Sequence, residues 1–105
     1  MNILTIIIKK KYFHQILRGE KTEEYRLIKR YWKNIIENGK YTHIRFKNGY
    51  NDNCPQLLIE YKGYEKLTIR HEFFGEYPVE VYVLKLGKII SCTVAVIEKN
   101  LELQF

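Results

Sequence analysis

The sequence predicts an α+β fold, a small β-barrel of five to seven strands with two short helices in the N-terminal half of the chain. Three observations support this prediction. β-rich segments fill the chain from residue 41 onward, helical periodicity is confined to two segments before residue 40, and 105 residues are too few for two stable cores. We therefore expect a single domain spanning residues 1–105.

A change in periodicity defines the first two elements. Residues 2–8 are an apolar, β-rich run without alternation, which predicts a buried strand. Residues 9–18 place apolar side chains at i, i+3 and i+4, which predicts a helix, and Gly19 is well placed to end it. The apolar face of this helix consists of Phe13, Ile16 and Leu17.

A second short helix is predicted over residues 29–38, because its apolar side chains gather on one face and Gly39 follows in the C-terminal position. This face consists of Trp32, Ile35 and Ile36. Residues 20–28 have no clean helical period, so a loop or an extended segment is expected between the two helices.

The second half of the chain indicates mostly β-structure. Residues 41–47 alternate apolar and basic side chains, and turns rich in asparagine follow. Residues 56–61 and 66–70 predict a hairpin around Lys62-Gly63. The remaining expected elements are an aromatic-rich loop at 72–78, a strand at 79–86 that Gly87 breaks, and a last strand at 89–97.

The net charge of +6 is distributed unevenly. Residues 1–50 contain 12 Lys and Arg and 4 acidic residues, whereas residues 51–105 contain 6 and 8. Such asymmetry predicts a positively charged face, for which nucleic acid is the commonest partner. The alternative is that a Lys-rich composition only keeps a small protein soluble.

Composition and cysteine use predict a cytoplasmic protein. The 46% hydrophobic content argues against disorder, and the longest apolar run is too short to cross a membrane. Cys54 and Cys92 have no CxxC spacing, so free thiols are favoured over a disulfide. The three histidines share no metal-ligand spacing, and we expect no metal, cofactor, membrane partner or signal peptide.

One segment, FHQILRGEKTEEYR, contains a spaced motif of the form G-x-K-x-x-E-x-R. The residues of this motif are Gly19, Lys21, Glu24 and Arg26. Together with IRFKNGYNDNCP and YVLKLGKII further along, the segment resembles the ASCH domains, a branch of the PUA-like superfamily. The resemblance covers most of the chain and implies a PUA-like pseudo-β-barrel with a cleft beside the motif. It also implies binding of RNA or modified nucleosides; some members are ribonucleases, and one branch resembles N4-acetylcytidine amidohydrolases.

Each motif residue has an ordinary role and a functional one. Gly19 can end the helix, let a ligand approach the backbone, or do both. Lys21 can act as a base or nucleophile, hold a phosphate or carbonyl oxygen, or be a solvated surface residue. Glu24 and Arg26 share a face if their segment is extended, so they can fix the loop or divide a ligand between them.

The amidohydrolase branch uses a Lys, a Thr and a distant Glu, and this chain departs from that set. Lys21 matches the Lys, but Glu24 stands at the position of the Thr. Thr22 is close by without being the matching position, and Glu72 is the best candidate for the distant acid. The missing hydroxyl favours binding over this hydrolysis.

Aromatic and basic side chains near the motif are typical of single-stranded nucleic-acid sites. Tyr25 and Tyr31 are near the motif, Trp32 fits the core face of its helix, and Tyr50 is the better candidate for an exposed ring. Arg45 lies in a basic row on its strand that can follow a phosphate backbone. The predicted ligand contacts are Gly19, Lys21, Thr22, Glu24, Arg26, Arg45 and Tyr50.

Three functions follow from these observations. The first is binding of RNA or a modified nucleoside in a basic cleft. The second is an N4-acylcytidine amidohydrolase-like enzyme or a ribonuclease, with catalytic roles for Lys21, Glu24 and Glu72. The third is a protein-interaction adaptor.

Overall fold

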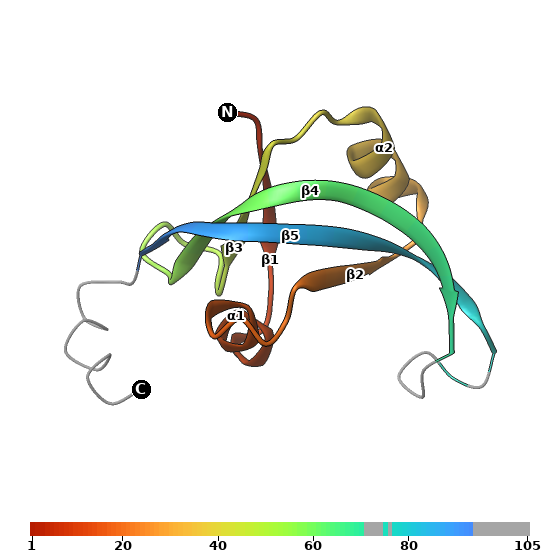
Figure 1. Ribbon diagram of the computed structural model, residues 1–105, viewed down its shortest axis with the longest axis horizontal. Coiled ribbons are helices and arrows are strands. Elements are labelled where there is room, and N and C mark those ends of the chain that lie inside the picture. Colours follow the sequence, from red (N-terminus) through yellow and green to blue (C-terminus); the bar gives the residue numbers. More distant parts are fainter. Residues whose placement is uncertain (71–74, 76, 94–105) are drawn as a thin grey trace.

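The protein is a curled, five-stranded half-barrel with two helices, which confirms the α+β class (Figure 1). The computed structural model describes residues 1–70, 75 and 77–93. The elements are β1 (Ile3–Ile7), α1 (Lys10–Leu17), β2 (Glu23–Leu27), α2 (Arg30–Asn38), β3 (His43–Lys47), β4 (Gln56–Ile69) and β5 (Val79–Thr93). Residues 94–97, the end of the last predicted strand, lie outside the described residues.

The sheet has the order β1-β3-β4-β5-β2, in which β1 runs parallel to β3 and the other pairs are antiparallel. β1 and β2 are therefore its two edges. The long strands β4 and β5 arch across the molecule in Figure 1, and this curvature brings the two edges to either side of one opening.

Both predicted helices are present and end within one residue of the expected bounds. α1 buries Phe13 and Ile16 in the core, and α2 buries Ile36. Trp32 is half-buried against the same core. Neither helix in the described part of the chain is long and apolar enough to cross a membrane.

The main core cluster lies on one face of the curled sheet, and Val81 and Val83 of β5 are buried on the other face. The alternation predicted for residues 41–47 is confirmed, since Ile44 and Phe46 are fully buried. β1 corrects the sequence prediction, because it does alternate: Leu4 and Ile6 are buried, whereas Ile7 is 37% exposed. Only one face of β1 packs on the core, and the opposite face, with Ile3, Thr5 and Ile7, stays partly exposed.

The predicted hairpin around Lys62-Gly63 is wrong, because β4 continues without a turn from Gln56 to Ile69. Gly63 has a φ of +98° and lies where the register with β5 shifts between Tyr61 and Tyr64. Gly87 does not break β5 either, and a second shift lies beside it. Extra residues of this kind bend and twist a strand, so the glycines curl the sheet instead of ending its strands.

Replacing Gly63 with Ala is expected to destabilise the fold by about 1–2 kcal/mol, because an L side chain is strained at positive φ. An added Cβ meets nothing within 4 Å, so the loss measures backbone strain alone. Urea denaturation gives the free energy of unfolding. Gly63→Asn, which tolerates positive φ better, should lose less; an Ala variant as stable as the wild type would contradict the bulge.

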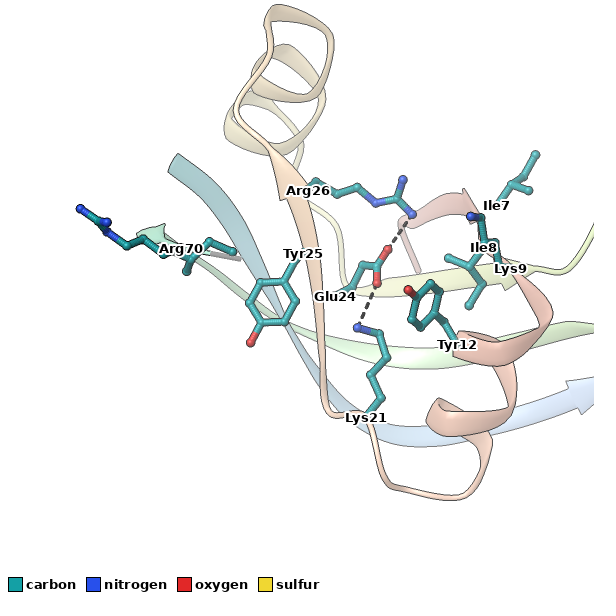
Figure 2. A pocket seen from close by; sticks show the side chains of 10 residues that line it. Ile7, Ile8, Lys9, Tyr12, Lys21, Glu24, Tyr25, Arg26 and Arg70 are labelled. Atoms are coloured by element: carbon teal, nitrogen blue, oxygen red, sulfur yellow. Dashed lines mark ion pairs between the residues drawn. The ribbon is translucent and has the colours of Figure 1, made fainter. Parts of the chain in front are cut away.

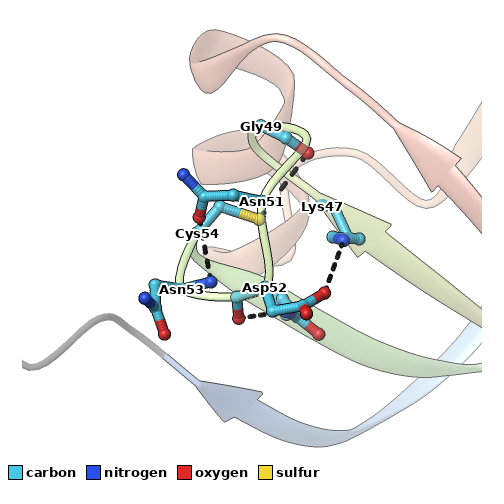
Figure 3. A network of polar contacts seen from close by, with 7 residues as sticks. Lys47, Gly49, Asn51, Asp52, Asn53 and Cys54 are labelled. Atoms are coloured by element: carbon cyan, nitrogen blue, oxygen red, sulfur yellow. Dashed lines mark hydrogen bonds and ion pairs between the residues drawn. The ribbon is translucent and has the colours of Figure 1, made fainter.

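The turn after β3 is held by local polar contacts, as its asparagine content predicts (Figure 3). The Asn53 backbone N–H donates to Asn51 Oδ1 at 2.9 Å, and the Cys54 thiol donates to the Gly49 carbonyl at 3.6 Å. No disulfide joins Cys54 to Cys92, and both lie in the described part of the chain. Tyr50 is 86% exposed in this turn.

Candidate functional site

An open cleft of about 660 Å³ lies between the two edge strands of the sheet. It is bounded by β1, the start of α1, β2 with its preceding loop, and the end of β4. Its lining residues are apolar (Ile7, Ile8, Ile69), aromatic (Tyr12, Tyr25) and charged (Lys9, Lys21, Glu24, Arg26, Arg70). Figure 2 shows Tyr25 and Arg70 on one side of β2, with Glu24 and Arg26 on the other, toward α1.

The end of α1 places Lys21 in this cleft. Gly19 has a φ of +77°, its N–H donates to the Ile16 carbonyl at 3.0 Å, and the Glu20 N–H donates to the Gln15 carbonyl at 2.9 Å. This pair of bonds is the Schellman arrangement, so Gly19 ends the helix as predicted. The Lys21 N–H donates to the same Gln15 carbonyl at 3.1 Å, which ties the motif loop to the helix.

β2 directs Glu24 and Arg26 toward the inside of the half-barrel. In its pairing with β5, Glu24 lies opposite Leu84 and Arg26 lies opposite Tyr82, and both partners are fully buried. Glu24 is 6% exposed and is the one buried charged residue in the described part of the chain. The extended alternative for residues 20–28 is therefore correct, and the two side chains share a face as that alternative requires.

Glu24 joins two cations into a row. Its Oε1 is 3.3 Å from Lys21 Nζ, and its Oε2 is 2.6 Å from a terminal nitrogen of Arg26, as drawn in Figure 2. We call Lys21, Glu24 and Arg26 the charged row. The Arg26 guanidinium also lies 4.9 Å from the centre of the Trp32 ring, so α2 supports the row from behind. Arg26 Nε is buried without an acceptor among the described residues.

Two tyrosine rings flank the ammonium of Lys21. Its Nζ is 5.5 Å from the ring centre of Tyr12 and 5.3 Å from that of Tyr25, and the two residues are 39% and 42% exposed. These distances allow cation–π attraction. Partly exposed faces next to a cation also provide surfaces on which a flat ligand can stack.

The Tyr25 ring is held by a short chain of polar contacts. Its hydroxyl donates to Glu23 Oε1 at 2.8 Å, and Lys85 pairs with the other Glu23 oxygen. Hydrogen bonds from Lys85 and Tyr25 lower the pKa of Glu23, and the bond to Glu23 together with burial raises the pKa of Tyr25. At neutral pH this contact orients the ring beside the cleft.

Glu37 anchors α2 to the two long strands of the sheet. It accepts a hydrogen bond from the Tyr82 hydroxyl, and Lys66 Nζ lies 3.0 Å from the same oxygen. These two donors lower the pKa of Glu37. A carboxyl group with a lowered pKa in the folded state stabilises the fold above its ordinary pKa and loses that contribution as the pH falls through the folded value.

We therefore expect Glu37→Gln to reduce the acid sensitivity of the fold. Below about pH 4.5 the free energy of unfolding should fall less in the variant than in the wild type, because the variant has no carboxylate at position 37 to be protonated. Urea denaturation at pH 7, 5, 4 and 3 measures this difference. A variant with the same pH dependence as the wild type would show that Glu37 makes no ionic contribution.

The structure places three of the predicted site residues, Lys21, Glu24 and Arg26, in the cleft lining, and four others lie outside the lining. Gly19 and Thr22 lie beside the cleft in sequence without lining it. Arg45 lies on β3 between the inward-facing Ile44 and Phe46, and Tyr50 lies in the following turn. Roles for these four in binding stay predictions. Glu72 lies outside the described residues.

Sequence reasoning missed the residues that complete the cleft from other elements. Tyr12 precedes the buried Phe13 on α1, and nothing in the helical period shows that its side of the helix faces β2. Lys9 and Arg70 follow the ends of β1 and β4, and only the curled topology brings these ends to the motif.

Comparison with protein-family models, with curated proteins and with solved structures found no match to the chain.

Proposed function

We propose that the protein binds single-stranded RNA or a modified nucleoside in the cleft between β1 and β2. The observation that carries this proposal is the convergence of Lys21, Glu24 and Arg26 on one open cleft. These are three of the four motif residues that support the ASCH resemblance, so the resemblance and the geometry favour one function.

The charge of the cleft suits an anionic ligand. Four cations line it, and Glu24 is the single carboxylate among the lining residues that the structure describes. Two of the cations, Lys9 and Arg70, form no ion pair with another described residue. Both are exposed at the margin of the cleft, where phosphate groups can approach. Phosphate contacts of this kind position a nucleic acid without reading its sequence.

The size and lining of the cleft suit a base. Its volume of about 660 Å³ lies within the range typical of small-molecule sites. Tyr12 and Tyr25 are partly exposed in the cleft, and single-stranded bases are commonly held by stacking on such rings. The cleft can therefore take a base while the backbone follows its basic margin.

Binding is favoured over hydrolysis by the residues that line the cleft. None of the described lining residues is a Ser, Thr, Cys or His, so the candidate nucleophiles and bases there are limited to lysine, glutamate and tyrosine side chains. Lys21 is engaged with Glu24 and with two rings, the contacts of a charged ammonium. The hydrolase and adaptor alternatives stay predictions from the sequence.

Incubation with N4-acetylcytidine and with labelled RNA, comparing wild type with Lys21→Ala, tests the hydrolase alternative.

Fluorescence anisotropy with an end-labelled, mixed-sequence RNA octamer tests the proposed binding. We expect binding at 50 mM salt that weakens steeply by 200 mM, because each neutralised phosphate on a single strand contributes a slope of roughly −0.7 in log K against log salt. An octamer that fails to bind at low salt would end the proposal.

A further inference from the structure

We propose that the base taken up in the cleft is of the uracil type, a pyrimidine whose edge offers a donor between two acceptors. The inference rests on the proposed nucleic-acid binding and adds which base the charged row reads. The edge is shared by uracil, thymine and pseudouracil, so the ligand is defined by this chemistry.

The charged row presents donors on both sides of an acceptor. Lys21 carries an ammonium with three N–H donors, Glu24 carries two acceptor oxygens, and Arg26 carries a guanidinium with donors only. Each cation uses only part of its donor capacity on Glu24. Along the row the order is donor, acceptor, donor.

The pairing edges of the bases differ in how they meet this order. Uracil offers the O4 acceptor, the N3–H donor and the O2 acceptor, which complements all three positions. Cytosine has an acceptor at N3 and a donor at N4, so its N3 would face the Glu24 carboxylate and its amine would face a cation. Guanine can set its O6 against one cation and its N1–H and N2–H₂ donors against the two Glu24 oxygens, which leaves the second cation without an acceptor on the base.

The burial of the row strengthens this discrimination. The side chain of Glu24 is 9% exposed, that of Lys21 16% and that of Arg26 21%. With a mismatched base, the Glu24 carboxylate would face an acceptor or a cation would face a donor. Little water can reach these buried groups to replace the hydrogen bond that is not made. Sites that bond a ligand edge in this way reject analogues that lack the matching group.

Competition binding tests the inference. Labelled rU8 is displaced by unlabelled rU8, dT8 or rC8, and we expect rU8 and dT8 to compete about tenfold or more better than rC8, the discrimination expected of a well-formed base contact. The relative strength of rU8 and dT8 identifies RNA or DNA as the source of the base. Equal competition by rC8 would overturn the inference and leave nucleic-acid binding in place, whereas no binding by any oligomer would overturn both.

Modified octamers distinguish recognition of the hydrogen-bonding edge of the base from an effect of strand flexibility. An oligomer of N3-methyluridine has lost the central donor and should bind about tenfold or more weakly, whereas 5-methyluridine keeps the edge and should bind like uridine. Equal binding of the two methylated oligomers would overturn the inference, since both carry one added methyl group.

Glu24→Gln gives the matching test on the protein. The amide keeps the volume of the side chain and can turn its NH₂ group toward the N3 acceptor of cytosine. We expect the preference for rU8 over rC8 to fall by about fivefold or more, while Lys40→Gln, an exposed charge change outside the cleft lining, leaves it unchanged. An unchanged preference in Glu24→Gln would overturn the reading of the base by the charged row.

Discussion

Glu24→Ala is expected to lower the free energy of unfolding by about 3 kcal/mol, because it leaves two partly buried cations without their shared partner. This loss is at the low end of the range typical for breaking a buried ion pair. The side chains of Lys21 and Arg26 are 16% and 21% exposed, so water can reach them in the variant.

Urea denaturation of three variants apportions this loss. Glu24→Gln keeps the volume and one acceptor and should lose less than Glu24→Ala. A triple variant, Lys21→Met, Glu24→Leu and Arg26→Leu, removes all the charges together and should recover stability relative to Glu24→Ala. If Glu24→Ala unfolds at the wild-type urea concentration, the charged row does not hold β2 to the motif loop.

Arg26→Gln is expected to weaken binding of single-stranded RNA by about tenfold or more, because a charge-assisted hydrogen bond to a ligand is lost. The salt slope should change by at most about 0.7 if Arg26 also contacts a phosphate, and should stay the same if it contacts only a base. Anisotropy titrations across a salt series measure both quantities.

Two control variants make the result for Arg26 specific. Lys40→Gln removes an equal charge from an exposed position outside the cleft lining and should change the affinity by less than about twofold. Arg26→Lys keeps the charge but loses the planar fork, so a partial loss is expected. Equal effects of Arg26→Gln and Lys40→Gln would show that RNA responds only to net charge.

The strands that sequence predicts well are those with a plain apolar face. Ile44 and Phe46 alternate with basic residues, and β3 was predicted from that pattern. For β2 the sequence does not distinguish a loop from an extended segment, because the inward positions hold Glu24 and Arg26 and the strand therefore has no apolar alternation. A strand with charged side chains at its inward positions lacks the apolar alternation by which strands are recognised in a sequence.

Two glycines show why local sequence signals do not predict the curvature of the sheet. Gly19 and Gly63 both have positive φ, yet one ends a helix and the other lies in a bulge of a continuous strand. Which outcome occurs depends on β5, whose pairing continues on both sides of Gly63. Strand pairing over such separations is not encoded in the residues next to the glycine.

The motif identifies only the part of the cleft that one segment of the chain forms. The spacing of Lys21, Glu24 and Arg26 predicted a shared site, and the structure places them in one row. Tyr12 and Arg70 come from α1 and the end of β4, so only the curled sheet reveals them. Local spacing can predict a row along one segment, whereas a cleft formed by four segments requires their packing.

An NMR titration of ¹⁵N-labelled protein with unlabelled octauridine locates the bound strand most directly. We expect amide shift changes to gather at residues 7–12, 21–26 and 69–70, which surround the cleft, with Lys40 unaffected. Changes confined to residues 43–53, the basic strand and its turn, with none at 21–26, would contradict binding in the cleft.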